Sequence, residues 1–211
     1  MKILVVGGST DYARWINRPI ELIADKIENV KDADLVLFTG GADVNPDLYG
    51  FCKNSKTYCD KGRDEYEVRF YKKALELKIP MVGICRGAQL LTALQSKGLL
   101  IQDVTGHARM HPHEIEFNDG EKMLATSTHH QMMYPYNAAH ELIAWSSVKL
   151  SEKYEFDNNT IINALPKNKE PEIVFYYKTN CLAIQPHPEY MDKNSRLVVK
   201  LNELLEEKFS L

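Results

Sequence analysis

The stretch IPMVGICRGAQLLTAL, residues 79–94, decides the fold and contains the most informative side chain of the protein. Residues 79–84 form a short apolar run that predicts a buried strand, and residues 88–94 begin a helical pattern. The turn between them, GICRG, has the G-x-C-x-G form of a strand–turn–helix nucleophile elbow. Glycine two places before and after Cys85 removes the β-carbons that would collide in so sharp a turn. We therefore predict that Cys85 projects from the carboxyl end of a strand, where the N-terminus of the following helix favours a thiolate.

The segments on either side of this elbow alternate between strand-like and helix-like patterns. Residues 2–6 and 34–38 are continuous apolar runs, and residues 20–30 and 64–77 have apolar side chains at helical spacing. An alternation of strands and helices predicts parallel pairing with right-handed crossovers. We place Asp64 at the start of the second helix, where a carboxylate caps the helix N-terminus.

The second half of the chain has several short strand candidates followed by one amphipathic helix. The strand candidates are residues 113–117, 122–125, 142–145, 160–163, 173–177 and 182–184. Residues 194–208 have leucines on one face and predict the closing helix. We therefore predict one α/β domain over residues 1–211, with an open, mostly parallel sheet flanked by helices and antiparallel strands in its second half. Residues 43–62 show little periodicity and predict a long loop of the kind that is usually functional.

Composition excludes several classes of protein. The 211 residues include 26 Lys and Arg against 29 Asp and Glu, with 44% hydrophobic and 26% charged residues. These ordinary globular values exclude a disordered chain, a collagen-like fibre and a coiled coil. The net charge of −3 argues against nucleic acid as a partner, and no apolar run reaches the ~18 residues of a membrane span. Residues 1–8 lack the features of a signal peptide, so we expect a cytoplasmic protein with free thiols.

A second motif offers the base that a cysteine nucleophile needs. QPHPE, residues 185–189, follows the strand predicted at residues 182–184 and therefore also lies at a strand end. Prolines on both sides of His187 restrict the backbone, and Glu189 can bind the outer ring N–H and stabilise an imidazolium. We therefore predict a triad in which Cys85 is the nucleophile, His187 the base and Glu189 the residue that orients the base.

A glycine-rich turn supplies the remaining part of such a site, an oxyanion hole. Gly40 and Gly41 follow the strand predicted at residues 34–38, which lies next to the elbow in the predicted sheet. Backbone N–H groups in this position can stabilise the charge that develops on a carbonyl oxygen. We predict the N–H groups of Gly41 and Arg86 as the two donors, with Gly40 as the alternative to Gly41.

Taken together, five segments resemble a known family in their order and residues. They are FTGGADVNPDLYG (38–50), RDEYE (63–67), ICRGAQLL (84–91), STHHQ (127–131) and QPHPE (185–189). The set resembles the class I glutamine amidotransferase-like proteins and, within them, the γ-glutamyl hydrolase branch that includes γ-glutamyl-γ-aminobutyrate hydrolase (peptidase family C26). The resemblance implies a flavodoxin-like, three-layer fold and an amide hydrolase with a Cys-His-Glu triad and no cofactor.

The resemblance also implies roles for individual residues. The three triad residues match the family's nucleophile, base and third member in that order. Gln89 matches the position that helps to hold the glutamyl group, and the pocket-lining S-x-H-x-Q block is matched at His129 and Gln131. Arg86, directly after the nucleophile, is typical of the hydrolase branch.

From this resemblance we expect a hydrolase of γ-glutamyl amide bonds that releases glutamate through a γ-glutamyl thioester. The expected substrate is a small molecule such as a γ-glutamyl-amine or a γ-glutamyl nucleotide phosphoramidate. Residues 146–148 are Ser-Ser-Val where the family has an Asp-Gly turn, so the leaving group stays open. Two alternatives remain, a glutaminase that supplies ammonia to a partner synthase and a non-catalytic binding protein on the same fold. The first would depend on its partner, the second would have a broken triad, and a homo-oligomer is open in every case.

Histidines gather in two other segments. His107, His111 and His113 have H-x-x-x-H-x-H spacing, and His129 and His130 follow later in the chain. A zinc site needs three or four converging ligands, and this spacing falls on no clear helix or strand. We therefore predict no metal site.

Overall fold

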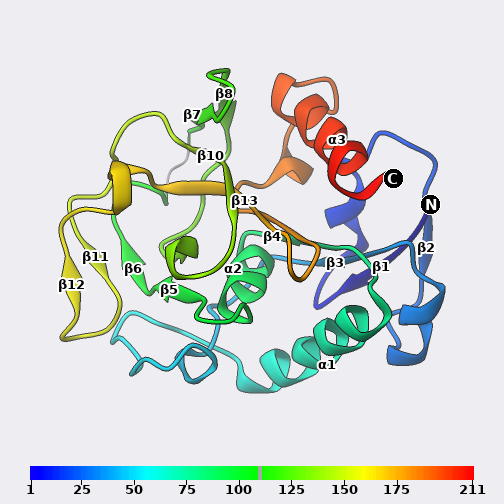
Figure 1. The fold of residues 1–211 in the computed structure, drawn as a ribbon, viewed down its shortest axis with the longest axis horizontal. Coiled ribbons are helices and arrows are strands. Elements are labelled where there is room, and N and C mark those ends of the chain that lie inside the picture. Colours follow the sequence, from blue (N-terminus) through cyan, green and yellow to red (C-terminus); the bar gives the residue numbers. More distant parts are fainter. Residues whose placement is uncertain (109–110) are drawn as a thin grey trace.

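Over residues 1–108 and 111–211, which the computed structural model describes, the fold is built on one mixed sheet of nine strands. The strand order is β2-β1-β3-β4-β14-β13-β10-β7-β8 (Figure 1). The parallel part consists of β2 (Glu21–Ile23), β1 (Lys2–Val6), β3 (Leu35–Phe38), β4 (Met81–Ile84) and β14 (Cys181–Ile184). The antiparallel part adds β13 (Pro171–Tyr176), β10 (Glu141–Ser146), β7 (His113–Phe117) and β8 (Lys122–Ala125). The predicted parallel half followed by antiparallel strands is therefore confirmed.

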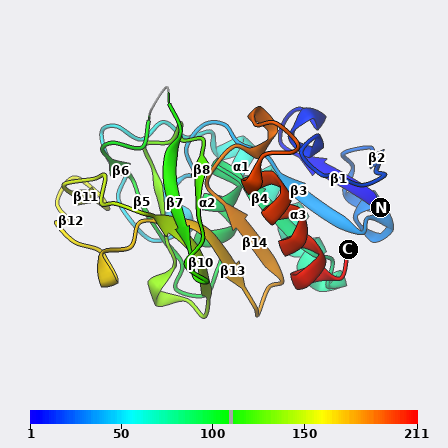
Figure 2. The same cartoon turned by 90° about the horizontal axis from the view of Figure 1, so that it is seen from above.

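Helices cover both faces of this sheet. α1 (Lys61–Leu77) and α2 (Arg86–Ala93) lie on one face, and α3 (Arg196–Phe209) lies on the other (Figure 2). Because successive side chains of a strand point to opposite faces, Ile3 of β1 packs in the cluster with α3, whereas Leu4 packs with α1 and α2. This arrangement confirms the three-layer fold. Because the central strands are covered on both faces, their sequences are unbroken apolar runs.

The two longer helices begin at residues whose side chains accept from a backbone N–H in the first turn. Asp60 accepts from the Arg63 N–H at the start of α1, and Ser195 accepts from the Val198 N–H at the start of α3. The leucines that predicted α3 are buried against the sheet, with Leu201 fully covered. None of the helices in the described part of the chain is long and apolar enough to cross a membrane.

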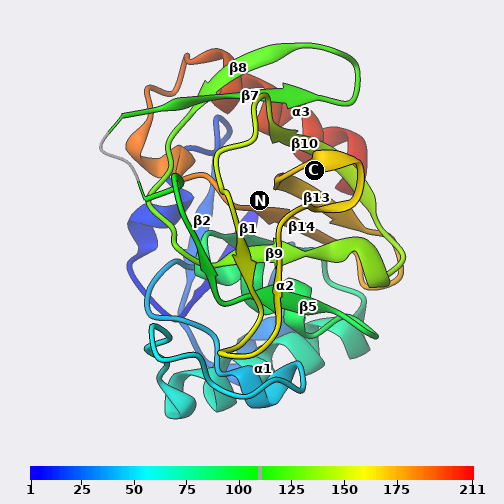
Figure 3. The ribbon, with the colours of Figure 1, turned by 90° about the vertical axis from the view of Figure 1, so that its left-hand side faces the viewer.

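Smaller elements surround one end of the sheet. One small sheet has the order β12-β11-β6, and a pair is formed by β5 and β9, which both pack against α2 (Figure 3). Their bounds are β5 (Leu99–Ile101), β6 (Asp103–Val104), β9 (Met132–Tyr134), β11 (Tyr154–Glu155) and β12 (Ile161–Ile162). The strand expected at residues 160–163 corresponds to β12, whereas the other four are too short to produce a periodic pattern and were not predicted.

Short 3-10 helices complete the connections between these elements. They are η1 (Thr10–Ala13), η2 (Ile27–Asp32), η3 (Pro46–Leu48), η4 (Pro135–Asn137), η5 (Pro166–Asn168) and η6 (Pro188–Tyr190). The loop predicted at residues 43–62 is confirmed up to the start of α1 at Lys61. Before α1 it contains only η3 and an isolated bridge between Asp43 and Cys59.

The helix predicted at residues 20–30 is wrong. This segment instead forms β2, whose residue Glu21 pairs with Lys2 of β1, followed by η2. The apolar side chains at helical spacing do not share a buried face, since Ile27 is 40% exposed and Ile20 and Val30 pack in clusters on opposite faces of the sheet. The open edge of β1 offers this backbone hydrogen-bond partners, whereas a short helix is costly to nucleate without a buried face.

Candidate active site

Cys85 lies at the junction of β4 and α2 in a conformation that few side-chain-bearing residues adopt. Its φ is 52° and its ψ is −108°, a region that costs free energy and persists only where the surroundings impose it. A β-carbon on Gly83 would lie 2.4 Å from the carbonyl carbon of Gly87, and one on Gly87 would lie 2.2 Å from the carbonyl oxygen of Phe38. Both glycines are therefore required for the tight turn, and the elbow predicted from G-x-C-x-G is present.

Strand pairing brings the two predicted motifs to the same sheet edge. β14 runs parallel to β4 with Ile184 opposite Ile84, and the Cys85 N–H donates to the Ile184 carbonyl at 2.8 Å. The chain therefore leaves both strands at the same end, and ligands in open α/β sheets bind outside this carboxyl end. His187, more than a hundred residues later in the sequence, reaches the thiol of Cys85 for this reason.

His187 is held between the thiol and a carboxylate. Its Nδ1 lies 2.6 Å from Oε1 of Glu189, and both side chains are buried. Burial alone would lower the pKa of His187, but side-chain hydrogen bonds with Cys85 and Glu189 raise it to about 10. The imidazolium form is therefore favoured at neutral pH.

Three residues that the sequence did not indicate fix the orientation of His187. The Thr126 hydroxyl accepts from the His187 N–H at 2.8 Å and lies 3.1 Å from the His187 carbonyl oxygen, to which it donates. The ring of Tyr190 stacks on the imidazole with centroids 5.0 Å apart, and the ring of Tyr12 lies 6.3 Å away. No motif pointed to Thr126 or Tyr12, because they come from distant segments that meet His187 only in the folded chain.

The predicted oxyanion donors lie beside these side chains. A β-carbon on Gly40 would lie 3.2 Å from Cε1 of His187, so the glycine turn after β3 passes directly along the imidazole. Gly41 has a φ of 144° and is exposed. Among the residues that the structure describes, neither the Gly41 N–H nor the Arg86 N–H donates to another protein group. Both N–H groups are therefore without an acceptor in the described part of the protein.

The Arg86 side chain points away from the candidate site into the protein. Only 1% of the residue is exposed, and its guanidinium forms short ion pairs with Asp64 and Glu67 of α1. Glu67 also binds Arg63 at 2.9 Å, and Nη2 of Arg63 donates to the Gly40 carbonyl at 2.8 Å. A chain of buried charges therefore links the residue after Cys85 to the glycine turn.

This network corrects the prediction for Asp64. The cap of α1 is Asp60, whereas the Asp64 carboxylate binds Arg86 and accepts from the Asn45 N–H at 2.9 Å. Burial raises the pKa of Asp64 even though the adjacent guanidinium of Arg86 opposes this effect. Local spacing suggested a cap, but the partner of Asp64 lies 22 residues away on a different helix.

The three residues matched to glutamyl binding lie together behind Cys85. Gln89, one turn into α2, donates its amide to the Gln131 carbonyl at 3.0 Å, and Nδ1 of His129 lies 2.7 Å from the same oxygen. All three are nearly fully buried. Burial and the neighbouring His107 lower the pKa of His129 to about 3, so its ring is neutral.

Comparison with known proteins shows the family. A sequence model of the Peptidase C26 family matches residues 14–189. The chain belongs to this family, and its fold is that of the class I glutamine amidotransferase-like proteins. Membership supports a function of the glutamine amidotransferase or hydrolase type.

The similar proteins carry related descriptions. The chain is 33% identical over 194 residues to a putative glutamine amidotransferase-like protein, YvdE, of Lactococcus lactis, covering 81% of this chain and 73% of the relative. A putative GMP synthase component from Thermoplasma acidophilum aligns with 100% of this chain and 94% of its own, at a TM-score of 0.58 and 13% identity. A glutamine amidotransferase from Thermotoga maritima aligns with 99% of this chain and 92% of its own, at a TM-score of 0.56 and 14% identity. At such identities the two structures establish the fold.

Proposed function

We propose that the protein is a cysteine-dependent hydrolase of γ-glutamyl amide bonds that acts on a small molecule without a cofactor. The observation that carries this proposal is the contact of His187 with both Cys85 and Glu189 at the end of two parallel strands. A nucleophile, a base and a group that orients the base are the parts that covalent amide hydrolysis needs. The exposed glycine turn beside the imidazole supports an oxyanion hole at the same place.

The proposed reaction has two stages. The Cys85 thiolate attacks the γ-carbonyl carbon, and the N–H groups of Gly41 and Arg86 hold the oxygen that becomes negative. The imidazolium of His187 gives its proton to the departing nitrogen, so the C–N bond breaks and a γ-glutamyl thioester remains. His187 then takes a proton from water, whose oxygen attacks the thioester, and glutamate leaves as the thiol is restored.

Gln89, His129 and Gln131 support the choice of a γ-glutamyl group, because they form a polar cluster one helical turn from the nucleophile. The side chains of Gln89 and His129 both bind the backbone carbonyl of Gln131, and the Gln131 amide donates to the Thr57 hydroxyl at 3.1 Å. The substrates that we propose are a γ-glutamyl-amine and a γ-glutamyl nucleotide phosphoramidate. Because Arg86 is typical of the hydrolase branch, we favour independent hydrolysis over ammonia supply to a partner synthase.

Glutamate release from a panel of γ-glutamyl amides, with glutamine included, tests this proposal directly. We expect turnover of at least one γ-glutamyl-amine or phosphoramidate by the isolated protein. Acid quenching during turnover should leave one γ-glutamyl group on the peptide that contains Cys85, seen by mass spectrometry. Release only from glutamine, and only with a partner protein present, would instead establish a glutaminase that serves a synthase.

The pH dependence of turnover should report the environment of His187. The imidazolium must protonate the leaving nitrogen, so kcat/KM should fall as the pH rises through about 10, the raised pKa of His187. In Glu189→Gln the amide no longer raises that pKa, so the alkaline limb should move down by about 1–3 pH units. The exposed Glu152→Gln variant is the matched control and should keep the wild-type limb. An identical limb in Glu189→Gln and the wild type would show that this carboxylate does not control the base.

A further inference from the structure

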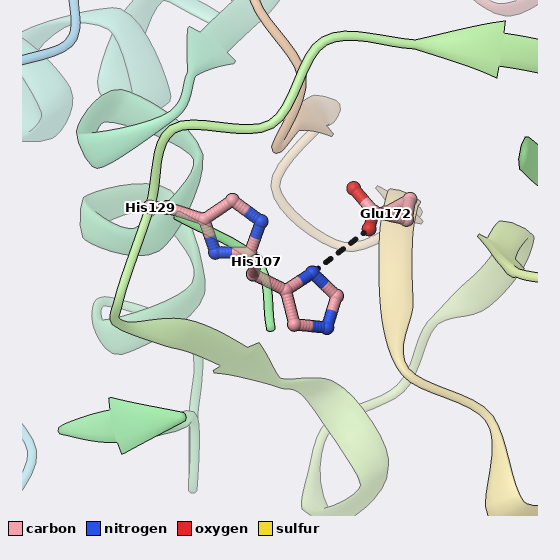
Figure 4. Close-up of side chains that lie close together, drawn as sticks. All are labelled: His107, His129 and Glu172. Carbon is pink, nitrogen blue, oxygen red and sulfur yellow. Dashed lines mark ion pairs between the residues drawn. The ribbon is translucent and has the colours of Figure 1, made fainter. Parts of the chain in front are cut away.

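A second cluster of buried polar side chains shares His129 with the cluster behind Cys85, and the proposed reaction has no use for its other members. His107, His129 and Glu172 come from three separate segments, and each is at most 4% exposed. Each offers one nitrogen or oxygen atom, and these three atoms lie within 4.8 Å of one another. Figure 4 shows the two rings and the carboxylate turned toward a common point.

The hydrogen bonds of these groups leave acceptors without donors. Nδ1 of His129 lies 2.7 Å from the Gln131 carbonyl oxygen, which can only accept, so the proton is on Nδ1 and Nε2 carries a lone pair. Nε2 of His129 and Oε2 of Glu172 are buried without a hydrogen-bond partner among the described residues, and Nδ1 of His107 also lacks a hydrogen bond, although it lies 3.5 Å from Oε1 of Glu172. Buried polar atoms without partners are costly, which indicates that a further group satisfies them.

Each of the three groups has a second partner on its outer side. Nε2 of His107 lies 3.2 Å from Oε2 of Glu170, and Oε1 of Glu172 lies 2.8 Å from Nε2 of His113. His129 has the Gln131 carbonyl in this role. Metal-binding histidines and carboxylates are oriented in this way by carboxylates, carbonyls and other donors around them.

The charges in the cluster also favour a cation. Glu170 and Glu172 are both fully buried, and Glu170 is satisfied by the N–H groups of Leu150 and Ser151 and the Tyr154 hydroxyl, each at 2.8 Å. Glu172 has one oxygen with a partner and one without. A proton on His107 would balance part of this charge, but it would leave the lone pairs of His129 and Glu172 unsatisfied.

We propose that His107, His129 and Glu172 bind a divalent metal ion of the zinc type, with water in the fourth position. Zinc accepts two imidazoles and one carboxylate in tetrahedral geometry, which places ligand atoms about 3.3 Å apart. The three candidate ligand atoms lie within 4.8 Å of one another, and Oε1 of Glu172, the oxygen that also binds His113, lies 3.5 Å from Nδ1 of His107.

This site departs from the expectation that the chain has no metal site. The sequence spacing grouped the wrong residues, because His111 is exposed and His130 turns to Asp43, at 3.1 Å, instead of into the cluster. The decisive ligand is Glu172, which no histidine spacing could indicate. The backbone carbonyl of Glu172, in β13, accepts from the N–H of Gln185 at 2.8 Å, and Gln185 lies two residues before His187. A bound ion would therefore stabilise the backbone that leads to His187.

Metal content and spectroscopy test the proposal. The Cys85→Ala protein is used alongside the wild type, so that a metal held by the catalytic thiol is not counted. After Zn²⁺ loading and dialysis against metal-free buffer, we expect about one zinc ion per chain in both proteins. Co²⁺ in its place should give the visible d–d absorption of a tetrahedral site without a thiolate charge-transfer band. The Tm of both proteins should rise with Zn²⁺ concentration.

Variants then locate the ion. His129→Ala and Glu172→Gln should lose the bound zinc, Glu170→Gln should bind it about 10–100-fold more weakly, and His140→Ala, outside the cluster, should keep it. The Co²⁺ spectrum of the unaltered chain decides the question if a variant fails to fold. Absence of retained zinc, of the d–d band and of a Tm change would show that a proton or buried water satisfies the cluster, and the proposal would then be wrong. Zinc retained equally by His129→Ala and His140→Ala would also overturn it.

Discussion

Replacing Cys85 with alanine is expected to lower kcat for glutamate release by roughly 10⁴-fold or more, because no thioester can form without the thiol. The oxyanion donors and the polar cluster behind position 85 remain, so substrate binding should persist. Initial rates and equilibrium binding of the best γ-glutamyl substrate measure the two effects separately. The change therefore removes chemistry while leaving the ground-state complex in place.

The controls for this variant address backbone strain and the other thiols. Cys85→Ser keeps a similar side-chain size at the strained φ of 52° and should also be nearly inactive. Cys52 is exposed and is not one of the candidate site residues, so Cys52→Ala should retain wild-type kcat. Activity of Cys85→Ala comparable with that of Cys52→Ala would rule out nucleophilic catalysis at the elbow.

The elbow was predictable because its signal is local. Ten residues contain a strand end, a turn that requires two glycines, and the beginning of a helix. The position of Cys85 therefore follows from steric rules that apply to any chain. The meeting of Cys85 with His187 needed one further step, the inference that both motifs follow strands of a parallel sheet. Parallel strands end at a common edge, and this made a contact across a hundred residues predictable.

The predictions for residues 20–30 and for Asp64 failed because their outcome depends on distant partners. An apolar pattern at helical spacing cannot reveal that the edge of β1 is open to a further strand. In the same way, the RDEYE segment shows three carboxylates near a helix start, but not the guanidinium of Arg86 that reaches two of them from α2. The buried histidine cluster is a third case, since Glu172 joins it only through the order of strands in the sheet.

The buried ion pairs of Arg86 lead to the second large expected effect. Arg86→Met removes the cation between two carboxylates, Asp64 and Glu67, that are 2% and 0% exposed. Loss of one partner from a buried ion pair typically costs roughly 3–5 kcal/mol, because the remaining charge cannot be solvated. We therefore expect a fall in Tm of about 10 °C and a lower urea midpoint. The deficit relative to the wild type should shrink at acid pH, since burial already raises the pKa of Asp64 and protonation removes its charge.

Two further variants separate charge from packing at this position. Lys73→Met breaks the exposed pair with Glu76 on the same helix and should change stability by less than about 1 kcal/mol. The triple variant Arg86→Met, Asp64→Asn, Glu67→Gln removes the stranded charges and should recover part of the loss, although Arg63 then loses its ionic partner. If Arg86→Met were no more destabilising than Lys73→Met, the network would not stabilise the elbow. If the triple variant recovered nothing, the loss would come from packing around Arg86, because the same carboxylates would no longer carry charge.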